Sequence, residues 1–193
     1  MILGDLLQQC YNIADTLIVG RFLGSDALAA VGSSFTLMTF LTSILLGLSM
    51  GSGTVFSIRF GQKDIQGLKE GILASFFLLS VVTVVLNVFI FVGLDWIIWF
   101  LRTPMQLVGL MKEYLIIIFS GLVGIFLYNY FASLLRSLGN SVTPLIFLAI
   151  SAILNIVLDI YFVTNLNRGV AGAAEATVIS QYVSGIGIAI YTK

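Results

Sequence analysis

Three polar residues spaced four apart stand out in an apolar segment in the last third of the chain. They are Ser151, Asn155 and Asp159, and the rest of the run from residue 145 to residue 163 is almost wholly hydrophobic. On an α-helix this spacing puts all three side chains on one face. A charged side chain at membrane depth costs about 2.5–3.5 kcal/mol even on lenient insertion scales, so an acid in such a segment is a functional candidate. The pattern predicts a polar stripe that needs polar partners elsewhere in the chain.

A second polar face is expected at the start of the chain. Its members are Asp5, Gln8, Asn12 and Asp15, which follow one another at steps of three, four and three residues. This spacing also places them on one side of a helix. Two carboxylates on one membrane-embedded face are hard to satisfy by hydrogen bonds to neighbouring helices alone. We therefore expect this face to line a water-filled pathway; the alternative is a face buried in a helix bundle.

The composition indicates that both faces belong to an integral membrane protein. Of 193 residues, 59% are hydrophobic and only 9% are charged, against about 25% charged in a soluble domain. The length allows about six transmembrane helices of about 20 residues. Net charge is zero, which gives no indication of a nucleic-acid partner. With no His, a single Cys and no phosphate-binding loop, the chain is expected to be neither an enzyme nor a cofactor-binding protein.

An all-α bundle of six membrane-spanning helices, forming one domain over residues 1–193, is therefore expected. The predicted helices are 2–20, 27–58, 71–100, 108–135, 143–163 and 170–191. The most charged segment, 59–70, is expected to be a solvated loop. Trp96 and Trp99 are expected to mark the exit of the third helix from the bilayer, because Trp prefers the membrane interface.

Small residues indicate where helices should pack closely. Gly47 and Gly51 form a G-x-x-x-G pair, which is expected to admit a neighbouring helix. The start of the sixth helix, GVAGAAEAT, predicts tight packing for the same reason. Glu175 lies in that segment, and the sequence leaves open whether it faces the bundle or the membrane interface.

Oxygen-bearing side chains on four predicted helices fall in one layer of the membrane. A slight excess of Lys and Arg favours cytoplasmic termini, which places Asp15 and Asp159 about 6–8 Å below the outer ends of their helices. Asn155 lies one turn deeper, and Tyr114 and Thr177 reach a similar depth of about 10 Å. Hard cations such as Na⁺ are bound by several oxygen atoms, whereas a proton requires only the carboxylates. The layer therefore predicts a site for Na⁺ or H⁺.

Three stretches of the sequence resemble one family. The first is QQCYNIADTLIVGRFLGSDALAAVG; the others are LLRSLGNSVTPLIFLAISAILNIVLDIYFV and, just after it, GVAGAAEATVIS. Together they are similar to the MATE multidrug efflux transporters, and most of all to the prokaryotic DinF-like branch. The resemblance implies a twelve-helix fold of two six-helix lobes with a substrate cleft between them. This chain resembles only the amino-terminal lobe.

The resemblance also implies roles for individual residues. The acid of the first helix that couples export to H⁺ or Na⁺ is matched by Asp15. The remaining coupling-site matches are Asn155 and Asp159 on the fifth helix, Thr177 on the sixth and Tyr114 on the fourth, with Tyr128 or Tyr130 as rivals for the last. Gln8 and Asn12 are expected to lie along the substrate pathway.

The expected function is export of drugs across a prokaryotic cytoplasmic membrane by H⁺- or Na⁺-coupled antiport. The expected partners are the lipid bilayer, small organic and often cationic substrates, and either the missing carboxy-terminal lobe or a second copy of the chain. The chain starts just past the place where family members usually carry a Pro in the first helix. Two alternatives remain: a lipid-linked oligosaccharide flippase of the same superfamily, and a non-transporting membrane scaffold.

Overall fold

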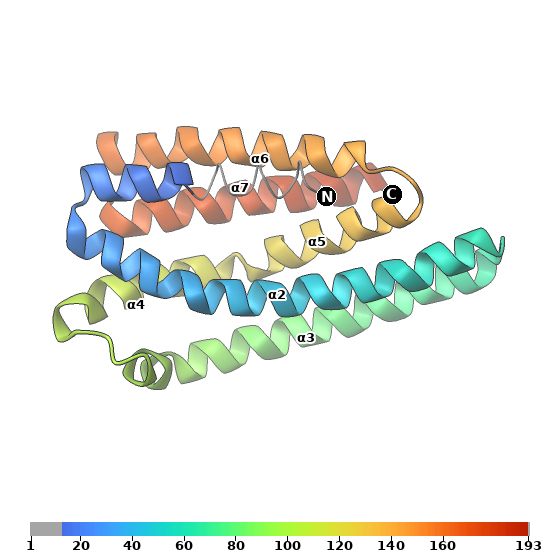
Figure 1. The fold of residues 1–193 in the computed structure, drawn as a ribbon, viewed down its shortest axis with the longest axis horizontal. Coiled ribbons are helices and arrows are strands. Elements are labelled where there is room, and N and C mark those ends of the chain that lie inside the picture. The colour runs from blue at the N-terminus through green and yellow to red at the C-terminus, as the bar shows by residue number, and fades with distance from the viewer. Residues whose placement is uncertain (1–12, 193) are drawn as a thin grey trace.

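The computed structural model describes residues 13–192, so the predicted pathway residues Gln8 and Asn12 lie outside the described part. Within it, every regular element is a helix (Figure 1). Residues 13–22 are helical, and they are followed by α2 (Ser25–Gly61), α3 (Ile65–Phe100), α4 (Met105–Ser120), α5 (Leu122–Ser137), α6 (Val142–Ile160), the π-helix η1 (Tyr161–Asn165) and α7 (Gly169–Thr192).

The described helices account for four or five of the six predicted membrane spans, and all of them are helical as expected. Four of the described helices are long and apolar enough to cross a membrane, and α4 and α5 together make a fifth, bent span. The first predicted helix, 2–20, is described only from residue 13 onwards, where it is helical to residue 22. In Figure 1 this segment lies beside α6 and α7, while α2 crosses to the opposite side of the bundle.

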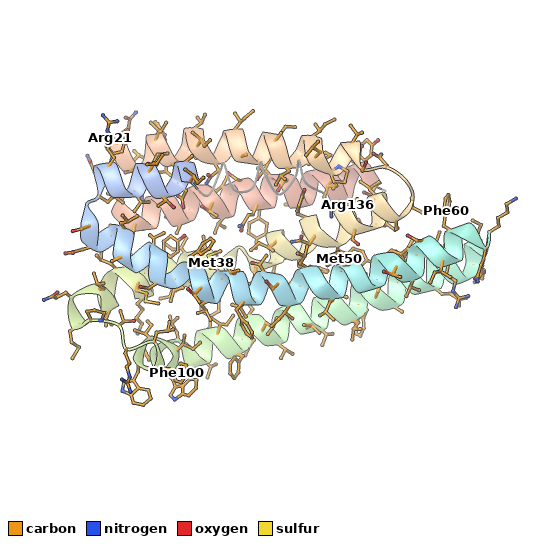
Figure 2. The ribbon with its side chains drawn as sticks, in the orientation of Figure 1. Arg21, Met38, Met50, Phe60, Phe100 and Arg136 are labelled. Carbon is orange, nitrogen blue, oxygen red and sulfur yellow. The ribbon has the colours of Figure 1, made fainter. Side chains whose placement is uncertain are left out.

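The expected solvated loop at 59–70 is wrong, because helices α2 and α3 take up most of it. These two helices have 37 and 36 residues and form a long hairpin joined only by residues 62–64. Asp64 caps α3: its Oδ1 accepts a hydrogen bond from the Gly67 amide at 2.9 Å, and Oδ2 pairs with Arg59 Nη1 at 2.5 Å. The Gly67 amide, assisted by the Arg59 guanidinium, holds the pKa of Asp64 below its usual value. Figure 2 shows Phe60 near the tip of this hairpin and Phe100 at its other end.

The predicted fourth helix, 108–135, is not continuous. It breaks at Gly121 into α4 and α5, whose axes are bent by 42°. The fifth predicted helix, 143–163, is close to α6 plus η1, which together run from Val142 to Asn165. Trp96 and Trp99 lie in the last turns of α3 and are exposed, as expected of interfacial residues.

The predicted close approach at Gly47 and Gly51 is wrong. Among residues 13–192, a Cβ atom added at either position meets no other atom within 4 Å, so no close helix–helix contact forms there. The close contacts lie elsewhere: a Cβ on Gly185 of α7 would be 2.6 Å from the Gly124 carbonyl oxygen of α5. The small-residue start of α7 is buried as predicted, with Ala173 and Ala174 at its centre. Thus α7 packs at the middle of the bundle, and the G-x-x-x-G pair does not.

Gly185→Ala should weaken the α5–α7 contact, because the new methyl group has no room beside the Gly124 carbonyl. We expect the free energy of unfolding in mixed micelles to fall by about 1–3 kcal/mol, as for other overpacked interiors. Gly47→Ala is the matched control, since its Cβ meets open space. Equal stability of the two variants would contradict the packing described here.

Candidate functional site

Two carboxylic acids from different helical segments meet in the bundle. Asp15 comes from the segment 13–22 and Asp159 from the last turn of α6, and their carboxyl groups are direct neighbours. The Asp159 side chain is 0% exposed. Both Asp159 oxygens and Asp15 Oδ1 have no hydrogen-bond partner among residues 13–192. Two adjacent carboxylates in a low dielectric are costly to keep ionised together, so this pair is a candidate site for a proton or a cation.

The polar stripe of α6 faces protein, as its spacing predicts. Asn155 is 1% exposed, and its Nδ2 donates to Thr177 Oγ1 at 3.2 Å. Ser151 Oγ donates to the Ser180 carbonyl oxygen at 2.9 Å, so the stripe lies along α7. On the opposite face of α6, Ile153 is 66% exposed. The helix therefore turns its polar side towards the bundle and its apolar side outwards.

A cavity of about 640 Å³ lies against these residues. It is lined by the segment 13–22 and by helices α2, α4, α5, α6 and α7. The predicted residues on its wall are Asp15, Tyr114, Asn155 and Thr177; Asp159 lies behind the wall, against Asp15. Among the described lining residues Asp15 is the one charged side chain, and the other polar groups are hydroxyls and amides.

The structure separates the three tyrosines that compete for a place at the site. Tyr114 of α4 is 5% exposed and lines the cavity. Tyr128 also lines it, but its hydroxyl donates to the Pro144 carbonyl oxygen at 3.0 Å. Tyr130 is not a lining residue: its hydroxyl donates to the Ile72 carbonyl oxygen at 2.7 Å, and its ring packs among the aromatic residues between α3 and α5. Tyr130 is therefore removed from the candidates.

Glu175 does not join the acid pair. Its Oε2 accepts a hydrogen bond from Arg168 Nη1 at 2.7 Å, and this ion pair is partly exposed where η1 turns into α7. Of the two orientations left open by the sequence, the structure thus supports the one at the edge of the bundle.

The sequence analysis missed polar groups on α7 and α2 that line the same cavity. Gln181 is one of them, and its Oε1 has no hydrogen-bond partner among the described residues. A signal was present, since Thr177, Ser180, Gln181 and Ser184 follow the i, i+3, i+4, i+7 spacing of one helical face. On α2 the cavity-lining residues Thr39, Thr42 and Ser43 are likewise spaced i, i+3 and i+4, on one helical face.

The donor set suits a hard monovalent cation or a proton. In the part of the chain that the structure describes, no three His, Cys, Asp or Glu side chains come together. For a cation held there, ligands beyond the two acids would have to come from the amide of Asn155 and from hydroxyls such as that of Thr177. Oxygen donors of this kind bind hard cations, and Asn155 Oδ1 is a buried oxygen with no partner among residues 13–192.

Thr177→Val should destabilise the folded protein, because it leaves the buried Asn155 amide without its acceptor. We expect a loss of about 1–3 kcal/mol in the free energy of unfolding, the usual cost of an unsatisfied buried polar group. Thr177→Ser keeps the hydroxyl and should stay close to the original protein. A valine variant as stable as the serine variant would show that this hydrogen bond contributes nothing.

Comparison with known proteins agrees with this architecture. The MatE family description matches residues 1–161. The chain is 35% identical to the probable multidrug resistance protein YpnP of Bacillus subtilis (strain 168), an alignment that covers 95% of this chain and 41% of YpnP. It is 28% identical to DNA damage-inducible protein F of Escherichia coli (strain K12), covering 95% of this chain and 40% of that protein.

Among solved structures, one described as a crystal structure of MATE in the bent conformation superposes with a TM-score of 0.93. Sequence identity is 29%, and the match covers 99% of this chain and 42% of that one. The chain thus spans about two fifths of the length of the relatives it matches. It belongs to the MatE family of membrane transporters and has the fold of one lobe of such a protein.

Proposed function

We propose that this chain is the amino-terminal, cation-coupled lobe of a transporter that exports cationic organic molecules across the cytoplasmic membrane by antiport with H⁺ or Na⁺. The observation that carries the proposal is the buried contact of Asp15 and Asp159 beside a cavity whose wall includes Asp15. The likeness to the probable multidrug resistance protein YpnP supports the substrate class.

Competition for the negative charge of the acid pair couples export of the organic cation to entry of H⁺ or Na⁺. When neither a proton nor a metal cation is bound, the acid pair attracts an organic cation into the cavity. When H⁺ or Na⁺ binds, the pair is neutralised and that attraction is lost. A ligand shifts a conformational equilibrium only through its different affinity for the two states, so the surroundings of the acids must differ between the inward- and outward-open forms.

The segments that carry the two acids are held in different ways. Ile13 and Leu17 are exposed, whereas Val19 is fully buried. Asp159, in contrast, belongs to a helix whose polar stripe is held by hydrogen bonds to α7. Because these hydrogen bonds hold α6 against α7, the Asp15 side is the one that moves in this proposal.

The cavity supports a small organic substrate in size and charge. Its volume of about 640 Å³ lies within the range of about 300–1,000 Å³ that small-molecule sites occupy. Its described lining contains Asp15 and neither Lys nor Arg. A flippase for anionic lipid-linked oligosaccharides would need a basic cleft, and a scaffold would need no cavity with an acid in its wall. Both alternatives fit these observations less well.

Asp159→Asn and Asp15→Asn should each abolish ion-driven export, because neither variant retains two acids to share a proton or a cation. The full-length product of the reading frame that contains this chain is reconstituted in lipid vesicles, and transport of ethidium is followed under an imposed pH or Na⁺ gradient. Asp26→Asn, at the exposed start of α2, is the control and should export normally. Full transport in both acid variants would refute the proposal.

Binding of the same dye should strengthen as pH rises. Deprotonation of the acid pair restores the negative charge that attracts the cation, so low pH should compete with dye and high pH should favour it. Fluorescence titrations of the reconstituted protein at several pH values, without any gradient, measure this directly. A dye affinity that is independent of both pH and Na⁺ would leave the acid pair without a coupling role.

A further inference from the structure

The break between α4 and α5 is capped by side chains from two other helices. Because a helix end leaves carbonyl oxygens without intrahelical partners, a break at membrane depth needs donors from elsewhere. Asn87 Nδ2 of α3 donates to the Phe119 carbonyl oxygen at 3.1 Å. Tyr182 of α7 donates its hydroxyl hydrogen to the Ser120 carbonyl oxygen at 2.8 Å. The last carbonyls of α4 are thus bound from both sides of the bundle.

Gly121, at the break itself, has no room for a side chain. An added Cβ would lie 2.8 Å from Gln181 Oε1 and 2.9 Å from Val178 Cγ2, and 3.0 Å from the Ile118 carbonyl oxygen. Two of these three neighbours belong to α7, which therefore packs directly against the backbone of the break. By contrast, a Cβ on Gly109, earlier in α4, meets nothing within 4 Å.

The angle of this break determines where α4 places Tyr114. Tyr114 lies seven residues before Gly121, which is about 10 Å along the helix. A change of about 10° in the bend would move its backbone by about 2 Å, enough to withdraw a hydroxyl group from a cation-binding distance. The same helix that caps the break, α7, also carries Thr177 on the cavity wall.

We propose that Gly121, Asn87 and Tyr182 are positioning residues for the coupling site: they fix the α4–α5 angle so that Tyr114 lies at the cavity wall together with Asn155 and Thr177. The inference rests on the proposed function, because it takes Tyr114 to be part of the ion site. It adds that the hydrogen bond from Tyr182 to Ser120 ties the Tyr114 helix to the Thr177 helix. None of the three positioning residues is itself assigned as an ion ligand.

The first test is the ion dependence of export by Gly121→Ala and Tyr182→Phe. In the full-length protein in vesicles, the Na⁺ or H⁺ concentration for half-maximal ethidium export should rise about 3- to 10-fold, the effect of losing one hydrogen bond of ordinary strength. The maximal rate at saturating ion should be retained. Gly109→Ala and Tyr191→Phe are the matched controls, because Gly109 has open space and Tyr191 is exposed at the end of α7.

A second substitution tests the steric cause. Val178→Ala removes one of the three close contacts of the added Cβ, the methyl group at 2.9 Å, so it should return the ion dependence of Gly121→Ala part of the way towards that of the original protein. A merely destabilised protein would lose maximal rate without a shift in ion dependence. That outcome, or an unchanged ion dependence in both Gly121→Ala and Tyr182→Phe, would overturn the proposal.

A third measurement separates this inference from the proposed function. Spin labels at the exposed positions Met105 and Leu166, with Cys10 replaced, report the distance between the outer end of α4 and the end of η1 by electron resonance. Gly121→Ala should displace the α4 label by about 4 Å for a 10° change over its 16 residues, and Gly109→Ala should not. Equal distances in both variants would refute the positioning role. If Gly121→Ala displaces the label but the original protein shows no ion-driven transport, the proposed function is refuted instead.

Discussion

The buried contact of two carboxyl groups is the constraint on which the rest of the structure depends. Asp15 and Asp159 come from segments far apart in the sequence, and neither has a salt-bridge partner: the three ion pairs of the described chain involve other acids. Ionising both groups in a low dielectric is prohibitively costly. The pair is therefore suited to hold a proton or a cation between its two carboxyl groups, with Asp159 fully buried and Asp15 at the cavity wall.

Helix α7 provides most of that support. Its small residues allow close contacts: Gly185 lies against the Gly124 carbonyl of α5, and Ala174 is fully buried. Its polar face supplies the hydroxyl of Thr177 to Asn155. Small residues and interhelical hydrogen bonds are what hold helices together in lipid, where apolar surface gives little driving force for association. Helix α7 thus provides both the close helix contacts and the polar side chains of the site.

The proximity of the candidate site residues was easier to predict from sequence than the shape of the elements. The sequence placed these residues together from two observations: the spacing of Asn155 and Asp159, and the depth of Asp15. An acid exposed to lipid is costly, so acids in membrane helices face the interior of the bundle. The break at Gly121 was missed, and the side chains that leave no room for a Cβ there, Val178 and Gln181, come from a distant segment. A glycine inside an apolar run gives no sign of such neighbours.

Two other errors have a common cause. Charge at residues 59–70 was taken as evidence for a loop, yet Asp64 serves there as a helix cap. Gly47 and Gly51 were taken as a packing site because of their spacing, yet they face open space. In both cases a local pattern was compatible with more than one environment. Only the tertiary structure decides whether a polar residue ends a helix or begins one, and whether a small residue meets a neighbour.

The length of the α2–α3 hairpin has a consequence for how the protein sits in the bilayer. At about 1.5 Å per residue its 37- and 36-residue helices are about 55 Å long, whereas the hydrocarbon layer is about 30 Å thick. Tilt alone would have to approach about 57° to absorb the excess, beyond the usual limit of about 40°. The hairpin must therefore extend beyond the hydrocarbon layer, and its charged tip with Arg59 and Lys63 is suited to the headgroup layer. The hairpin thus sets how deeply the rest of the lobe sits in the bilayer.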